Sequence, residues 1–334
     1  MTASPVAQKK MKPYENVPRP EWQVMLVRIF VFGPIIALFG LAIPLAAVFG
    51  WFSWHDLVLG LVFYMIASRG IGTGFHRYET HRSFKPKRVL RIALAISGSM
   101  AIEGGLLSWV GDHRRHHKYS DREGDPHSPW RFGTDLKALL KGMYYAHMGW
   151  FFSDEVTNYK VFAPDYLPGT KDPDAQWLNA WFPAFAIGGL IAPALIGWAW
   201  GGSWHYAITA LIWAGIVRMM LVHHITWSIN SICHTVGTRP FRPAANKADK
   251  ASNVWWLAWF SGGESWHNVH HADPTLARHG VKLAEVSPGV FKLRNLPDGN
   301  ARLIWIFWKL GWLDGDPKWP TVEGMSKRQL EPSA

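Results

Sequence analysis

The sequence predicts an all-α membrane protein in which four transmembrane helices form two hairpins and a cytoplasmic helical cap holds a histidine-rich dimetal site. Three observations lead to this prediction. Four long stretches carry almost no charge, basic residues gather outside them, and eight of the 16 histidines lie in three short clusters. With 49% hydrophobic residues and 21 tryptophans among 334 residues, the composition is typical of integral membrane proteins.

The first hairpin is predicted over residues 29–75. Ile29–Trp54 has no charged residue and is long enough to cross a bilayer. Leu57–Phe75 has one, Arg69, which lies near the end of the stretch and can reach the interface. The turn between the two stretches has no Lys or Arg, whereas Arg77–Arg91 carries six. The positive-inside rule therefore places both ends of this hairpin in the cytoplasm.

The second hairpin is predicted over residues 177–225. Trp177–Trp204 is uncharged, and Tyr206–Ile225 carries only Arg218, near its end. The turn again lacks Lys and Arg, so this hairpin is expected to have the same orientation as the first. The remaining segments are predicted to be cytoplasmic: an N-terminal tail (1–28), a first part of the cap (76–176) and a second part of the cap (226–334).

The stretch Ile92–Gly111 is ambiguous, because it is apolar apart from Glu103. A crossing there would place the first two histidine clusters on opposite faces of the membrane, where they could not share a metal site. We therefore interpret it as a helix that lies at the interface or packs on protein. Ala301–Leu313 is interpreted in the same way. The net charge of +11 is attributed to basic residues that flank the spans and face anionic lipid, so no nucleic-acid partner is expected.

The histidine clusters are the candidate metal ligands. Gly111–Ser120 and Trp266–Ala272 each place three histidines at i, i+3 and i+4, which share one face of a helix. Phe75–Phe84 holds two more, and His234 is a ninth candidate. Isolated histidines are usually surface or core residues. No role is therefore assigned to His55, His147, His205 and His279.

Eight or nine imidazoles are too many for one ion, so two metal ions are implied. Imidazole suits iron, zinc, copper and nickel. A lone zinc needs four ligands, a haem needs histidines across facing spans, and a metal transporter would place ligands at the bilayer midplane. The single cysteine, Cys233, excludes a Cys-rich site. Two redox metals beside an apolar cavity then favour oxygen activation on a lipid chain.

The motifs HRYETHRSF, DHRRHHKYSD with GDPHSP, NSICH and GESWHNVHH resemble the histidine boxes of integral-membrane fatty acid desaturases, in particular the stearoyl-CoA (Δ9) branch. The resemblance covers roughly Ile29 to Gly280. It implies an O₂-dependent diiron enzyme of unsaturated fatty acid biosynthesis that introduces a cis double bond, at Δ9, into a saturated acyl chain. A bacterial inner membrane with the active site facing the cytoplasm is expected.

The resemblance also implies roles for individual residues. Two irons would be bound by nine histidines, His76, His81, His113, His116, His117, His234, His267, His270 and His271, with Asn230 holding a metal-bound water. Trp109, Thr226 and Trp227 match the bend of the family's acyl tunnel, and Tyr64 lies where the family closes it; ordinary membrane-protein packing is the alternative. Asp112, Glu264 and Asp273 flank the boxes and are candidates to orient ligand histidines, the alternative being simple surface charge.

One position departs from the family pattern. The animal acyl-CoA branch has an Arg immediately before the Asp of the second box, where this chain has Gly111. The acyl carrier, CoA or a lipid, therefore stays open. The sequence has no HPGG motif of a fused cytochrome b5, so a separate electron donor such as a ferredoxin or a flavin reductase is expected. Two alternatives also stay open, a membrane diiron lipid hydroxylase or oxygenase and a non-catalytic membrane metal-binding or transport protein.

Overall fold

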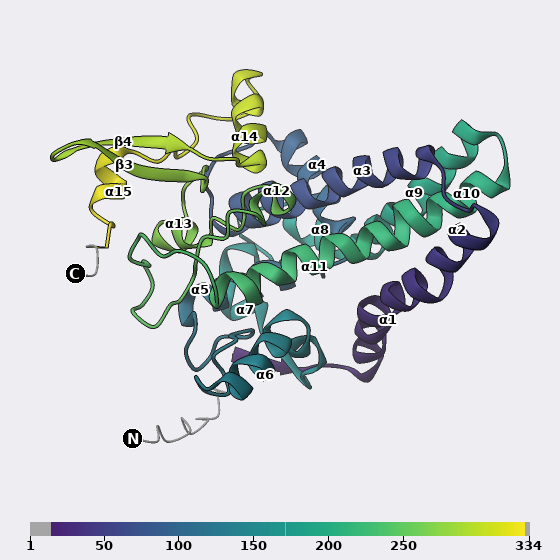
Figure 1. Ribbon diagram of the computed structural model, residues 1–334, viewed down its shortest axis with the longest axis horizontal. Coiled ribbons are helices and arrows are strands. Elements are labelled where there is room, and N and C mark those ends of the chain that lie inside the picture. Colours follow the sequence, from purple (N-terminus) through teal and green to yellow (C-terminus); the bar gives the residue numbers. More distant parts are fainter. Residues whose placement is uncertain (1–14, 171, 331–334) are drawn as a thin grey trace.

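A computed structural model describes residues 15–170 and 172–330 of the chain. The protein is mostly helical, which confirms the predicted fold class. The long apolar helices lie together on one side, and the cap, with its short helices and strands, lies on the other (Figure 1). Residues 1–14 of the predicted N-terminal tail lie outside the described residues.

Four helical stretches are long and apolar enough to cross a membrane, as predicted: Glu21–Phe49, Trp54–Thr80, Phe182–Gly201 and Trp204–His234. The second and the fourth continue beyond the predicted apolar segments. Because backbone hydrogen bonding does not stop where the apolar stretch stops, these two helices extend into the cap and carry box histidines with them.

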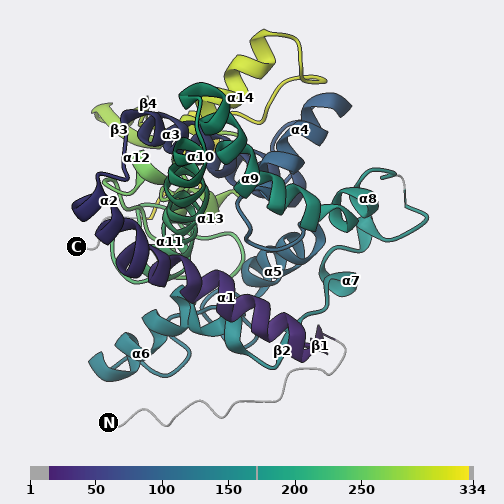
Figure 2. The same cartoon turned by 90° about the vertical axis from the view of Figure 1, so that its right-hand side faces the viewer.

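The four stretches are built from several elements. The label η marks turns that are not α-helical: η2, η3 and η6 are wider π-type turns, and η7 is a tighter 3₁₀ turn. The elements are α1 (Glu21–Ala37), η2 (Leu38–Ala42) and α2 (Ile43–Phe49), then α3 (Trp54–Arg69) and η3 (Gly70–Thr80), then α9 (Phe182–Gly201), and finally α10 (Trp204–Ala210), η6 (Leu211–Val217), α11 (Arg218–Ser231) and η7 (Ile232–His234). Figure 2 looks along this bundle, in which α3 packs against α9 and α11.

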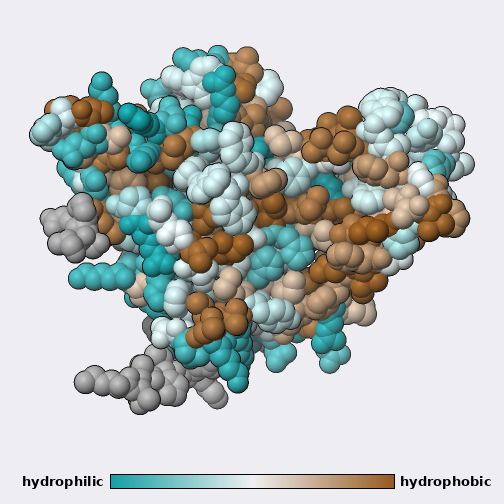
Figure 3. Space-filling view, viewed as in Figure 1, coloured by the Kyte–Doolittle hydropathy of each residue, from teal (hydrophilic) through white to brown (hydrophobic). Residues whose placement is uncertain are grey.

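The outer faces of the spans are apolar. Large side chains such as Phe39, Val48 and Leu195 are 67%, 71% and 59% exposed. In Figure 3, hydrophobic side chains are numerous over the half of the molecule formed by the spans. Apolar surface on this scale is unusual for a monomer in water and indicates contact with lipid.

A close backbone contact joins the second span to the cap. A Cβ atom added at Gly70 would lie 2.1 Å from the backbone nitrogen of Gly98 in α4 (Arg88–Ser99). We expect Gly70→Ala to cost about 1–3 kcal/mol by overpacking and to lower the melting temperature in detergent by several degrees. Gly188→Ala is the matched control, since nothing lies within 4 Å of its added Cβ. Equal melting of both variants would contradict this contact.

The segment Ile92–Gly111 is two helices, so the expectation of a single helix is wrong. The chain leaves α4 at Ser99 and starts α5 (Leu106–Tyr119) seven residues later. Gly104 between them has φ +112°, which no α-helix contains and which glycine adopts at low cost. Neither α4 nor α5 is among the four candidate spans.

The cap also contains two small antiparallel sheets that were not predicted. One pairs β1 (Asn16–Pro18) with β2 (Glu155–Thr157), and the other is the hairpin of β3 (Val281–Ser287) and β4 (Val290–Asn295). The remaining helical elements are α6 (Leu136–His147), η4 (Gly149–Phe152), α7 (Tyr159–Phe162), η5 (Pro164–Tyr166), α8 (Ala175–Ala180), α12 (Ala258–Ser261), α13 (His267–Ala272), α14 (Gly299–Lys309) and α15 (Val322–Ser326). The position of α14 matches the helix predicted over Ala301–Leu313.

Candidate metal centre

The first box depends on the π-type winding of η3. His76 and His81 are five residues apart, which in an α-helix would turn their side chains about 140° away from each other. In η3 the backbone N–H of His81 instead donates to the carbonyl of His76, at 3.2 Å, which is the i→i+5 bond of a π-helix. The two rings therefore lie on the same side, with centroids 5.0 Å apart.

The second and third boxes share their histidines between two groups. On α5, His113 and His117 turn toward one group and His116 toward the other. On α13 the division is reversed, with His270 in the group of His113 and the two others in the group of His116. Each HxxHH box thus gives two imidazoles to one group and one to the other, as the i, i+4 and i+3 positions of a helix allow.

All nine predicted ligand histidines are brought together in two groups. The first group is His76, His81, His113, His117 and His270, and the second is His116, His234, His267 and His271. Within each group the candidate ligand atoms lie within 4.8 Å of one another. Two groups of four or five imidazoles fit two metal ions.

The spacing of the ring nitrogens fits a central ion. In the second group, the Nε2 atom of His267 lies 3.0 Å from that of His234 and 3.1 Å from that of His271. Two nitrogens bound at right angles to one ion, with bonds of about 2.1 Å, would lie about 3.0 Å apart. In the first group, the Nε2 atom of His270 lies 3.0 Å from that of His76 and 2.8 Å from that of His117.

Hydrogen bonds between the rings cannot by themselves explain the short distances between the ring nitrogens of the second group. The Nδ1 atoms of His234 and His271 face the carboxylates of Asp121 and Asp249, at 2.7 and 2.6 Å, so they carry the ring protons. When the rings are neutral, both Nε2 atoms are bare lone pairs directed at the Nε2 atom of His267, which has at most one proton to donate. At least one of these contacts therefore sets lone pair against lone pair, which a cation relieves. The donor set fits a metal ion.

Burial also keeps three imidazoles of the first group neutral. It lowers the pKa of His81, His113 and His117 well below the ordinary value, and the neighbouring histidines lower it further. A neutral imidazole keeps the lone pair that a metal ligand needs.

Four carboxylates hold the outer nitrogens of box histidines. Glu264 pairs with Nδ1 of His76, and each histidine so held presents Nε2 to its group. The other three pairs are His116 with Asp125 at 3.0 Å, His234 with Asp121 at 2.7 Å and His271 with Asp249 at 2.6 Å. Burial alone would raise the pKa of the Asp249 carboxyl, but His271 outweighs burial and holds it well below its ordinary value.

Among the three carboxylates predicted to orient ligands, only Glu264 contacts a box histidine in the described part of the chain. Asp112 accepts a hydrogen bond from Thr157, and burial raises its pKa to about 6. Asp273 pairs with Arg328 at 2.8 Å. Asp121 and Asp125 follow the second box closely in the sequence but were not predicted, and nothing in the sequence marked Asp249.

We expect Asp249→Asn to weaken metal binding by about 10–100-fold, because the amide is a poorer partner for Nδ1–H of His271 and leaves its tautomer less fixed. The matched control is Asp273→Asn, which changes the same carboxyl to the same amide but contacts Arg328 instead. Metal content after a timed chelator challenge measures the difference. Equal retention in the two variants would contradict the assignment of Asp249.

A narrow cavity of about 60 Å³ runs from the metal groups between α3 and α11. Tyr64, Trp109 and Thr226, three of the four predicted tunnel residues, line it, and so does Asn230. Trp227 does not line it but is buried beside it, against His223 and Phe151. His76, His113 and His267 also line it, so the cavity reaches both groups.

Glu103 does not line this cavity, but it hydrogen-bonds two residues that do, and sequence reasoning missed it. Trp109 donates from Nε1 to its carboxyl at 3.3 Å, and Thr226 hydrogen-bonds the same carboxyl. Burial raises the pKa of Glu103 to about 8. The carboxyl thereby ties two of the predicted bend residues together, and the only signal in the sequence was an acidic residue in an otherwise apolar stretch.

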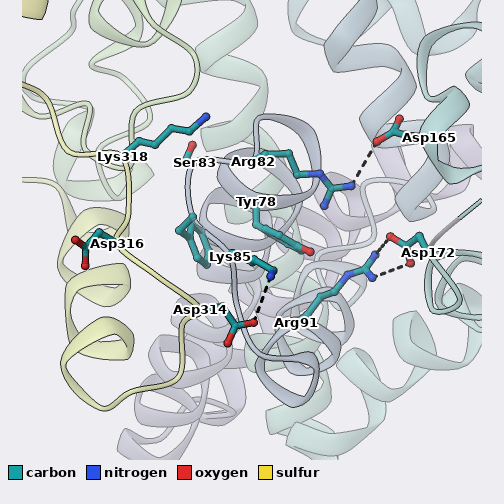
Figure 4. Close-up of a pocket in the computed structure, with 11 residues that line it drawn as sticks. Tyr78, Arg82, Ser83, Lys85, Arg91, Asp165, Asp172, Asp314, Asp316 and Lys318 are labelled. Atoms are coloured by element: carbon teal, nitrogen blue, oxygen red, sulfur yellow. Dashed lines mark hydrogen bonds and ion pairs between the residues drawn. The ribbon is translucent and has the colours of Figure 1, made fainter.

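A wider pocket, of about 590 Å³, lies on the cap beside Arg82, the residue that follows His81 (Figure 4). Six of its charged side chains pair with one another: Arg82 with Asp165 at 3.4 Å, Arg91 with Asp172 at 2.6 Å and Lys85 with Asp314 at 3.8 Å. A wall of ion pairs is unfavourable for an alkyl chain. The narrow cavity is therefore the better candidate for an acyl group.

Comparison with known proteins agrees with this geometry. The family model described as fatty acid desaturase matches residues 52–290, more than half of the chain. The chain belongs to the fatty acid desaturase family. The predicted family is thus confirmed, and the protein is an oxidoreductase that introduces a double bond into a fatty acyl chain.

Several curated relatives are similar over most of their length. The chain is 35% identical over 288 residues to the hex-5-enoyl-[acyl-carrier protein] acetylenase of Moorena producens, covering 85% of this chain and 84% of the relative. It is 35% identical over 257 residues to the sn-1 stearoyl-lipid 9-desaturase of Anabaena variabilis, covering 75% and 85%. It is 31% identical over 278 residues to the Delta-9 acyl-lipid desaturase 1 of Arabidopsis thaliana, covering 83% and 84%.

Proposed function

We propose that this desaturase is an O₂-dependent diiron enzyme that introduces a cis double bond at Δ9 of a saturated acyl chain carried by a membrane lipid. The observation that carries the proposal is the narrow cavity that reaches both histidine groups. Relatives named as Δ9 acyl-lipid desaturases support the position of the double bond and the lipid carrier.

Position 111 also favours a carrier other than CoA. A Cβ added at Gly111 would lie 3.0 Å from the Cα and Cβ atoms of Tyr159. The Arg that the animal acyl-CoA branch has at this point would therefore require Tyr159 to shift. The basic residues that follow the spans support an inner-membrane enzyme with its cap in the cytoplasm. Electrons would come from a separate donor such as a ferredoxin or a flavin reductase.

The residues of the chain supply binding and position. When bound by the nine histidines, with Asn230 holding a water, two irons supply the O₂-dependent oxidation that an unactivated C–H bond requires. The cavity would hold the methylenes that react and keep water away from them. Trp109 stacks on His113, with ring centroids 5.1 Å apart, and is tied to Thr226 through Glu103. The methylenes held at this bend therefore lie beside the first histidine group, and position decides which carbons react.

Lipid analysis of a desaturase-deficient host that expresses the chain tests the proposal. We expect monounsaturated acyl chains with a Δ9 double bond to appear only in the presence of O₂. When a labelled saturated acyl-lipid is supplied, the labelled chain should become unsaturated while it stays on the same lipid. Hydroxylated chains would instead support the oxygenase alternative. No change in the lipids of a host that makes metal-loaded protein would support a non-catalytic metal-binding role. Conversion of acyl-CoA alone would overturn the choice of carrier.

Tyr64 is expected to limit the length of the acyl chain. It lies on α3, twelve residues before His76, which is less than about 18 Å along the helix, because η3 winds more widely than an α-helix with its rise of 1.5 Å per residue. Its hydroxyl donates to the carbonyl of Phe260 at 2.7 Å and helps to close the cavity. Tyr64→Ala should admit chains longer by several carbons, with the double bond at an unchanged distance from the carboxyl end.

Gas chromatography with mass spectrometry of the products measures both quantities. Tyr64→Phe is the matched control, because it removes only the hydroxyl and keeps the ring that blocks the cavity. A double bond that moves in Tyr64→Ala would mean that the methyl end sets the position. No change in length or position would leave Tyr64 as a packing residue.

A further inference from the structure

His279 is a buried histidine outside the three boxes that lies beside the first metal group. Its side chain has no exposed area. Its ring centroid lies 4.6 Å from that of His270 and 5.8 Å from that of His76. Within residues 15–170 and 172–330, neither ring nitrogen of His279 has a hydrogen-bond partner. Buried polar groups are rarely left in this state, so the ring calls for an explanation.

His270 has a matching unpaired nitrogen. Its Nε2 atom faces the Nε2 atoms of His76 and His117, so the ring proton belongs on Nδ1. That Nδ1 atom is buried and has no hydrogen-bond partner among the described residues. Four other box histidines give this proton to a carboxylate, whereas the ring of His270 packs against the imidazole of His279.

The far side of His279 faces Glu264. The Nδ1 atom of His279 lies 3.8 Å from the Oε2 atom of Glu264, the oxygen that pairs with His76. This distance exceeds the upper limit of an N–H···O hydrogen bond by roughly 0.6 Å. The backbone N–H of His279 donates to Asp298 at 2.9 Å, and that residue also holds Arg77. The backbone is therefore fixed. A ring movement of roughly 0.6 Å would bring Nδ1 of His279 within hydrogen-bond distance of Glu264, and the ring already packs against His270.

We propose that His279 is a positioning residue for the first metal group. Its Nε2 atom accepts the Nδ1–H of His270, and its own Nδ1–H donates to Glu264. One carboxylate then orients two ligands, His76 directly and His270 through His279. The inference rests on the two-iron assignment proposed above. Carboxylates orient four other histidines directly, and in this proposal Glu264 orients His270 through the ring of His279.

Iron binding by the full chain in detergent tests the proposal. His279→Leu occupies a similar volume but has no ring nitrogen, and His279→Gln keeps one acceptor and one donor. His205→Leu, on the exposed start of α10, controls for the loss of a histidine. Each protein is loaded anaerobically with ⁵⁷Fe(II) and challenged with a ferrous chelator. Iron per chain, the rate of iron loss, the Mössbauer spectrum and the melting of the metal-free protein are measured.

We expect His279→Leu to release iron from the first group about 10–100-fold faster, which leaves about one iron per chain and one of two spectral components. His279→Gln and His205→Leu should behave like the wild type, and all metal-free proteins should melt alike. Wild-type iron retention in His279→Leu would overturn the proposal. Loss of both irons together with earlier melting of the metal-free His279→Leu variant would also overturn it, because that result is the one expected of a merely structural role. A wild-type chain that takes up fewer than two irons would overturn the two-iron assignment itself, and the inference with it.

Discussion

Replacing His113 or His271 by alanine is expected to lower desaturation by more than about 100-fold. Loss of an outer partner already costs about 10–100-fold, and these residues are placed to hold the metals themselves. His113 belongs to the first group, where it is half-buried, and His271 to the second, where it is buried. Each variant should lose one metal ion rather than two.

The measurements are unsaturated product per chain and iron per chain. His205→Ala and His55→Ala are the controls, because both residues lie at the turns between spans, away from either group. Variants of His113 and His271 that both retain two irons would refute the division into groups. Zinc in place of iron in an active preparation would refute the choice of metal.

Much of the architecture could be predicted because membrane spans and histidine boxes are local patterns. An uncharged stretch of about 20 residues identifies itself without knowledge of its neighbours. The i, i+3 and i+4 spacing on α5 and α13 likewise fixes which faces carry imidazoles. The need for the boxes to meet then excluded a crossing by Ile92–Gly111, although it did not reveal the break at Gly104.

The rest depends on contacts between segments that are far apart in the chain. A HxxxxH spacing does not show that η3 is π-type, because that winding depends on packing against α4 and α14. Asp249 is 22 residues from His271, and no local pattern links them. Asp273, close to the third box in sequence, points to Arg328 instead. Proximity in sequence was therefore a poor guide to the groups that orient ligands.

Replacing Arg77 by methionine is expected to destabilise the fold by about 3–5 kcal/mol, because it leaves two buried carboxylates without a counter-charge. The guanidinium is fully buried. It donates from Nε to Glu264 at 2.9 Å, and its Nη2 atom lies 3.0 Å from Asp298. It also donates to the carbonyl of Ala277 at 2.8 Å. The change should lower the melting temperature strongly and disturb Glu264, the partner of His76.

The matched control is Arg88→Met. Arg88 makes a two-point pair with Asp174, but its side chain is 70% exposed, so solvent screens the pair. Its loss should cost no more than about 1 kcal/mol. Thermal melting of both variants in the same detergent measures the difference. Similar melting temperatures for Arg77→Met and Arg88→Met would show that the buried ion pairs of Arg77 contribute no more to stability than the exposed pair of Arg88.

The loss of stability in Arg77→Met should also depend on pH, because the carboxyl of Asp298 titrates. In the wild type, burial would raise the pKa of Asp298, but Arg77 and other neighbours outweigh it and hold the pKa below its ordinary value. The stabilisation is therefore complete above the unfolded pKa of about 3.9 and is lost only as pH falls through the lower folded value. Without Arg77, His279 and the backbone N–H groups of Gly280 and Ala301 still lower the pKa of Asp298, but we expect burial to outweigh them and to raise the folded pKa above the unfolded one. The carboxyl then binds a proton more readily in the folded state, so the stability of the variant falls as pH rises. The difference in melting temperature between wild type and Arg77→Met should be larger at pH 7.5 than at pH 5.5, and a constant difference would mean that Asp298 finds another counter-charge.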